Sequence, residues 1–116
     1  MKTNWSHIDY HSASGSYLPK MPGIYAVMRV KRAFGIPLTL DVLYVGKSKN
    51  LYRRFTQHVD PYSQHNKSLN EINGAQGLEF WYVQASVDEL DQIERKLIRE
   101  LSPSANVVRY ANASTF

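Results

Sequence analysis

The sequence predicts a single α+β domain with a small three-stranded antiparallel sheet flanked by helices. Its 116 residues, 43% of them apolar, suffice for one modest hydrophobic core and not for two. Apolar residues alternate along the first of three strand-like segments and recur at helical spacing elsewhere in the chain. Cysteine is absent, which excludes disulfide scaffolds, thiolate zinc sites and cysteine nucleophiles.

Three segments are predicted to be strands. Residues 23–31 show the two-residue period of a strand, with one set of side chains on each face. Residues 40–46 form the antiparallel partner, and the basic connection at 32–39, which holds a glycine and a proline, is expected to be a long hairpin loop. Residues 78–84, which are apolar and aromatic, supply a third and largely buried strand.

Helices are predicted in three places. The stretch 47–59 contains an amphipathic helix capped by Ser48 or Asn50, because its apolar residues fall four apart. A short helix is expected at 67–73, ahead of a glycine that ends it. A final helix at 87–101 follows from a capping box, a serine and a glutamate three residues apart at its start.

The final helix carries a glutamate inside its apolar stripe. Five apolar residues share one side of this helix: Leu90, Ile93, Leu97, Ile98 and Leu101. Glu94 lies within the same arc. A carboxylate among leucines is costly to bury unless a cation, a metal ion or hydrogen bonds compensate it. The pattern leaves two interpretations open, a structural ion pair at the edge of the stripe and a metal site.

Positive charge is concentrated in the first half of the chain. The formal net charge is +4, and residues 1–59 hold 9 basic and 2 acidic side chains. Five side chains that can carry positive charge gather in and just before the first helix: Lys47, Lys49, Arg53, Arg54 and His58. They form either a solvated face or a phosphate-binding surface, to which the amides at the helix start and Gly46 would contribute.

The chain is expected to consist of an N-terminal extension at 1–21, one domain at 22–107 and a tail at 108–116. No apolar run approaches the length of a membrane span, and the polar start has no signal-peptide core. We therefore expect a cytoplasmic protein with no membrane partner.

Two tripeptides connect the sequence with a known family. Gly23-Ile24-Tyr25 begins the first predicted strand, and Tyr44-Val45-Gly46 ends the second. The similarity continues through YVGKSKNLYRRFTQH and IERKLIRELSPSAN, and it covers roughly residues 22–107. On these motifs the sequence resembles the GIY-YIG nuclease superfamily, as a stand-alone single-domain member. The resemblance implies the GIY-YIG fold.

The resemblance also implies roles for individual residues. Five positions match its catalytic groups: Tyr25, Tyr44, Arg54, His58 and Glu94. Glu94 is implied to hold a divalent ion, Mg²⁺ or Mn²⁺, with no small-molecule cofactor. A second group is expected to bind the substrate or support the site: Gly46, Lys47, Lys49, Arg53 and Asn106. The general base is open between Tyr25, whose free pKa is near 10, and His58, whose free pKa is near 6.5.

The function implied is metal-dependent hydrolysis of phosphodiester bonds in DNA. Single-stranded or distorted DNA is favoured, since five aromatic side chains are candidate platforms for unpaired bases: Trp5, Tyr10, Tyr17, Trp81 and Tyr82. Three alternatives stay open: a non-catalytic nucleic-acid-binding module of the same fold, a restriction-like duplex nuclease that acts as a dimer, and a small protein-interaction domain. The sequence does not decide the oligomeric state.

Overall fold

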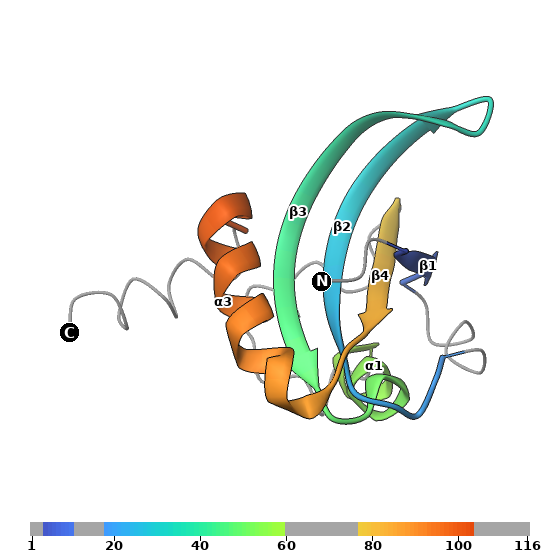
Figure 1. Ribbon diagram of the computed structural model, residues 1–116. Coiled ribbons are helices and arrows are strands. Elements are labelled where there is room, and N and C mark those ends of the chain that lie inside the picture. Colours follow the sequence, from blue (N-terminus) through green and yellow to red (C-terminus); the bar gives the residue numbers. More distant parts are fainter. Residues whose placement is uncertain (1–3, 11–17, 60–76, 104–116) are drawn as a thin grey trace.

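The computed structural model describes residues 4–10, 18–59 and 77–103 (Figure 1). Its elements are β1 (Ser6–Asp9), β2 (Gly23–Ala33), β3 (Ile36–Ser48), α1 (Leu51–Val59), β4 (Leu78–Gln84), a short 3₁₀ turn (Val87–Glu89) and α3 (Leu90–Leu101). The strands form one antiparallel sheet in the order β1-β4-β2-β3. The predicted α+β class and antiparallel sheet are confirmed.

Both faces of the sheet are covered, and the alternation along β2 decides which side chain meets which helix. Tyr25 and Val27 join the core beneath α1, whereas Ile24 and Ala26 join the core beneath α3. The helices contribute Leu51 and Phe55 to the first core and Leu90 and Ile98 to the second. A strand buried on both faces fixes its register tightly, because a slip of one residue would exchange the two faces.

The sheet has a fourth strand that the sequence did not predict. β1 lies in the segment assigned to an N-terminal extension and pairs with β4, with Ile8 opposite Phe80. Most of β1 is exposed and polar, as is common for a short edge strand, so its sequence pattern is weak. The alternation of Ile8 and Tyr10 with polar residues is the only signal, and Tyr10 is buried in the core beneath α1.

The predicted long loop at 32–39 is wrong, because β2 and β3 run through most of it. The turn consists of Phe34 and Gly35 alone, and their φ angles of 54° and 80° are those of a two-residue hairpin turn. Register shifts follow Val27 and Lys31. The resulting hairpin is long and curved, and its tip extends beyond β4 (Figure 1).

The helices begin largely as predicted. Asn50 caps α1, since its side-chain oxygen accepts a hydrogen bond from the Arg53 amide at 3.0 Å. Helix α3 begins at Leu90, after the 3₁₀ turn and three residues later than predicted. The predicted capping box does not form, because the Ser86 hydroxyl donates to the Glu89 carboxylate at 2.8 Å and neither side chain caps the backbone. Leu101, predicted to face the core, is 44% exposed. The helix predicted at 67–73 lies outside the described residues.

Within the described ranges, neither helix is long and apolar enough to cross a membrane.

Candidate active site

A buried phenol and a buried imidazole form the centre of the site. Tyr25 comes from β2 and His58 from the last turn of α1, and their exposed fractions are 1% and 4%. The Tyr25 hydroxyl lies 2.6 Å from His58 Nε2, and the two rings are 5.2 Å apart. Helix α1 is amphipathic, and it places His58 inward beside Leu51 and Phe55. The contact therefore joins two residues that are 33 positions apart in sequence.

Tyr44 and Gly46 complete the wall around Tyr25. The ring of Tyr44 lies 6.1 Å from that of Tyr25 and 5.6 Å from that of His58. Gly46 pairs with Tyr25 across the β2–β3 ladder, and a Cβ atom at position 46 would overlap the Tyr25 hydroxyl and ring. The structure thus shows a packing role for Gly46, because its missing side chain makes room for Tyr25, while its part in phosphate binding stays a prediction.

Glu94 and Arg54 both change the pKa of the Tyr25 phenol through their charges. Burial is the largest cause that raises the pKa of Tyr25 well above its usual value; the nearby charges of Tyr44 and Glu94 raise it further, and that of Arg54 lowers it. Glu94 is 2% exposed, and it projects from the face of α3 that packs on the sheet. The five residues predicted to be catalytic are therefore brought together at one end of the sheet.

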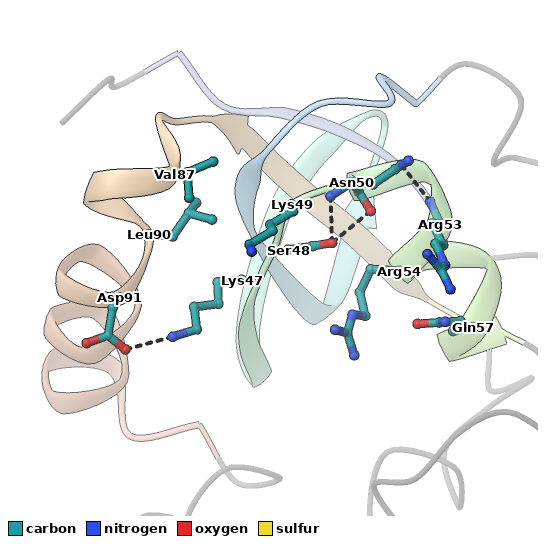
Figure 2. Close-up of a pocket in the computed structure, with 10 residues that line it drawn as sticks. All are labelled: Lys47, Ser48, Lys49, Asn50, Arg53, Arg54, Gln57, Val87, Leu90 and Asp91. Atoms are coloured by element: carbon teal, nitrogen blue, oxygen red, sulfur yellow. Dashed lines mark hydrogen bonds and ion pairs between the residues drawn. The ribbon is translucent and has the colours of Figure 1, made fainter.

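A basic pocket opens beside this centre (Figure 2). Its volume is about 500 Å³, and it lies between the start of α1, the end of β3 and the start of α3. Its lining includes Lys47, Lys49, Arg53 and Arg54, four of the five basic side chains predicted to form a phosphate-binding surface, whereas the fifth, His58, is buried. Arg54 is exposed, and Figure 2 shows its guanidinium in the open space between the two helices. This arrangement favours phosphate binding over a merely solvated face.

The backbone at the start of α1 cannot share in that task, contrary to the sequence-based expectation. The amides of Leu51 and Tyr52 donate to the carbonyl oxygens of Met21 and Pro19 at 3.0 and 3.2 Å. The next two amides of α1, those of Arg53 and Arg54, donate to the side chain and the backbone of the capping residue Asn50. Phosphate in the pocket would therefore meet side chains and not the helix terminus.

Asp91 is a site residue that sequence reasoning missed. Its carboxylate accepts a hydrogen bond from Lys47 Nζ at 2.7 Å and is 3.0 Å from Arg95 Nε (Figure 2). These two cations lower the pKa of Asp91 below its usual value, with the Lys47 bond as the larger cause. Lys47 is thus held across the pocket, from β3 to α3. Only the position of Asp91, three residues before Glu94 on the same helix, gave a hint of this.

The predicted base-stacking platforms are occupied within the protein. Trp81 stacks on His7 at 4.3 Å, and its indole N–H donates to Glu79 at 3.0 Å. Tyr10 is buried, while Trp5 and Tyr82 are half-buried against the two cores. Tyr17, the fifth predicted platform, and Asn106, the remaining predicted site residue, lie outside the described residues.

Comparison with known proteins places this geometry in a family. The sequence profile of the GIY-YIG catalytic domain matches residues 21–107. The chain belongs to the GIY-YIG nuclease superfamily. UvrABC system protein C of Caulobacter vibrioides is 32% identical over 91 residues, which cover 78% of this chain and 13% of that protein. Its counterpart in Rickettsia rickettsii is 31% identical over 90 residues, covering 78% and 12%.

Solved structures agree on the GIY-YIG fold. The N-terminal endonuclease domain of UvrC from Thermotoga maritima, bound to magnesium as its catalytic divalent cation, matches with a TM-score of 0.52 and 20% identity. The match covers 79% of this chain and 90% of that domain. The GIY-YIG fold implied by the two tripeptides is therefore confirmed. This chain spans only about an eighth of the length of the curated relatives it matches.

Proposed function

We propose that this GIY-YIG domain is a metal-dependent DNA endonuclease. The observation that carries the proposal is the hydrogen bond between the buried Tyr25 hydroxyl and His58 Nε2, next to Glu94 and to a basic pocket. A phenol, an imidazole, a carboxylate and a guanidinium supply the groups that phosphodiester hydrolysis needs: proton transfer, ion binding and charge stabilisation.

Tyr25 and His58 act together as the general base. The raised pKa of Tyr25 keeps its phenol protonated at neutral pH. Tyr25 can therefore accept a proton from the attacking water only as it passes its own proton to Nε2 of a neutral His58. The water oxygen forms a bond to phosphorus, and the bond from phosphorus to the leaving oxygen breaks. The two candidates for the general base thus act in sequence: Tyr25 accepts the proton of the water, and His58 accepts the proton of Tyr25.

Arg54 and Lys47 bind the phosphate. Arg54 is exposed in the pocket, and its planar guanidinium suits two non-bridging oxygens at once. Lys47 is oriented by Asp91, so it offers a positioned point charge at the opposite wall. Both cations oppose the negative charge that develops on the phosphate in the transition state. Lys49 and Arg53 extend the basic lining towards neighbouring phosphates.

Glu94 fits a divalent ion such as Mg²⁺ or Mn²⁺. Both ions favour oxygen ligands, and Glu94 is a buried carboxylate whose charge reaches Tyr25. In the part of the chain that the structure describes, no group of three His, Asp or Glu side chains could hold a metal. Water and phosphate oxygens would therefore complete the shell. When bound, the ion stabilises negative charge on the leaving oxygen.

The substrate we propose is distorted DNA in preference to a fully unpaired strand. The basic pocket recognises phosphate and has no aromatic lining. Among the described residues, the aromatic side chains that would stack on unpaired bases are buried or packed against protein. A cytoplasmic location and a single nick per binding event belong to the same proposal.

Labelled single-stranded, duplex, bulged and flap DNA, each with Mg²⁺, Mn²⁺ or EDTA, test the proposal. We expect metal-dependent nicks, fastest on the bulged or flap DNA, and a loss of at least about 10³-fold in rate for Glu94→Ala. Glu100→Ala, at an exposed position of the same helix, is the matched control and should cut normally. Binding without any cleavage would identify a non-catalytic module instead. Paired breaks in plain duplex by a dimer would identify a restriction-like enzyme.

A further inference from the structure

The β2–β3 hairpin continues as a two-stranded ribbon after the rest of the sheet has ended. The last residue of β2 that pairs with β4 is Arg29, and the Val30 amide makes one more bond, to the Gly77 carbonyl. From residue 31 to residue 40 the hairpin has no further strand beside β2 among the described residues. We call residues 31–40 the arm (Figure 1).

The arm exposes large apolar side chains. Phe34 at the tip is fully exposed, and three residues of β3 follow it at 61–64% exposure: Ile36, Leu38 and Leu40. A contiguous exposed apolar group of this kind is uncommon on a free protein and typically marks a binding surface.

The tip residue is held in an unfavourable backbone conformation. Phe34 has a φ of 54°, a left-handed angle that asparagine or glycine adopts at lower cost. No packing within the described chain compensates this cost, because Phe34 is fully exposed. A phenylalanine at this position therefore serves a contact outside the chain.

The charge of the arm selects the kind of partner. Residues 31–40 hold Lys31 and Arg32 and no acidic residue. Three carboxylates lie near the base of the arm, those of Asp9, Asp41 and Glu79, and the last two of them are matched by cations. Asp41 lies 4.0 Å from Arg29, and the buried Glu79 accepts hydrogen bonds at 2.9 and 3.0 Å from Arg32. Because Glu79 holds Arg32, the exposed Lys31 is the cation of the arm that is placed to meet phosphate. Apolar side chains beside a cation suit DNA, in whose minor groove apolar wedges enter between base steps while cations meet phosphates.

The edge of the arm is protected against pairing with another strand. Pro37 has no amide proton to donate, and a register shift follows Lys31 on the opposite strand. Proline and bulges are features with which proteins block strand addition at a sheet edge. The side chains of the arm are therefore its contact surface, and a second copy added through its edge is disfavoured.

We propose that the arm binds duplex DNA beside the cleavage site, with Phe34 as a wedge in the minor groove. The proposal rests on the endonuclease function and specifies its substrate as DNA with a duplex flank. Phe34 is nine positions beyond Tyr25 along the ribbon, a reach of about 30 Å at roughly 3.3 Å per residue. That reach corresponds to about nine base pairs at about 3.4 Å each.

Fluorescence anisotropy with duplexes of increasing length tests the reach of the arm. The measurement uses the Glu94→Gln protein, which binds without cutting, with and without the triple change F34N/I36T/L38T. We expect the affinity of the intact arm to rise about tenfold as the duplex grows from about 8 to about 20 base pairs. The triple variant should gain much less over the same range, while both proteins bind the shortest duplex equally.

A second readout tests the wedge itself. A 2-aminopurine base placed in the flank should become more fluorescent when Phe34 unstacks it, and F34N alone should remove the increase. F34N keeps the turn conformation, so a folding failure cannot imitate this result. Leu101→Ser, at an exposed apolar position outside the arm, is the matched control and should behave like the parent protein.

Two outcomes would overturn the proposal. One is an identical length dependence with and without the arm changes. The other is a dimer that the triple variant converts to a monomer with no change in its DNA length dependence, which would identify a second copy as the occupant. A protein that never cuts DNA but still shows arm-dependent binding would refute the endonuclease proposal and leave that of the arm intact.

Discussion

The two ends of the β2–β3 hairpin differ in burial although they belong to the same pair of strands. At the end where β3 finishes, α1 and α3 cover both faces, and the polar groups of Tyr25, His58 and Glu94 are buried there. At the turn end neither of the two described helices covers the ribbon, and Phe34 and Leu38 are exposed. In the functions that we propose, burial at the first end controls proton transfer, whereas exposed apolar surface at the second end binds a partner.

After Glu94→Ala, Arg54→Ala should have the largest effect, and it acts only at the buried end. We expect a fall of about 10²- to 10³-fold in cleavage rate, because a group that opposes charge in the transition state is lost. Arg54→Lys should recover little of this, since an ammonium lacks the planar fork. Steady-state cleavage measures both variants, with Arg53→Lys, its exposed neighbour, as the comparison. Full activity of Arg54→Lys would contradict bidentate binding.

Gly46→Ala should destabilise the buried end by about 2 kcal/mol or more. The new methyl group overlaps Tyr25, which is fully buried and stacked on Phe80, so neither ring can move without cost. Urea denaturation measures the change. Gly35→Ala would be a poor control because φ is 80° there, so Ala33→Gly in the arm is the better comparison. Unchanged stability in Gly46→Ala would show that Tyr25 has more room than the geometry indicates.

The ion pair between Arg32 and Glu79 marks the border between the two ends, and it predicts a pH dependence. Hydrogen bonding to Arg32 is the largest cause that lowers the pKa of Glu79 below its usual value of 4.5. A lowered pKa contributes stability above pH 4.5 that is lost as the pH falls through the folded-state value.

Glu79→Gln should therefore destabilise the protein by about 1–2 kcal/mol at pH 7, since charge-assisted hydrogen bonds are lost. The difference from the parent should shrink below pH 4.5. Chemical denaturation at pH 7 and near pH 3 measures it. A difference that does not depend on pH would show that Glu79 acts through packing and not through its charge.

Phe34→Asn should have the smallest effect on stability and the opposite sign. Replacing an exposed phenylalanine at a φ of 54° by asparagine relieves backbone strain. It removes no buried apolar contact, because Phe34 is fully exposed. We expect a gain of about 0.5–1 kcal/mol in a thermal melt. A loss of stability would show that Phe34 packs within the chain, and it would remove one basis for assigning it an external partner.

Local patterns predicted the buried end well. Two tripeptides, the spacing from Arg54 to His58 and one misplaced glutamate pointed to residues that the fold brings together. The contact between Lys47 and Asp91 was not predicted, because two residues that are 44 positions apart leave no periodic signal in the sequence. The hydrogen bonds of the first two amides of α1 were not predicted either, since their acceptors, the carbonyl oxygens of Met21 and Pro19, lie outside the helix pattern.

The arm was predicted poorly for a physical reason. Glycine and proline within 32–39 favour a loop, and an isolated ribbon gains little from burial that a pattern could reveal. β1 was missed on the same grounds, because a short polar edge strand is specified by its neighbour β4 and not by its own sequence. An alternating sequence pattern therefore predicts a strand only where another element buries one of its faces. A strand that no element covers leaves no such pattern.

The cross-strand fit of Tyr25 against Gly46 also limits how this GIY-YIG domain can change over evolutionary time. While the tyrosine is present, the glycine cannot acquire a side chain, because the space is already filled. Once a smaller residue has replaced the tyrosine, alanine at position 46 becomes acceptable, and a returning tyrosine would then meet an obstacle that its ancestor did not. Two reversions would be needed where one change abolished the chemistry. The fit acts as a ratchet, so a lineage that loses this site does not easily regain it.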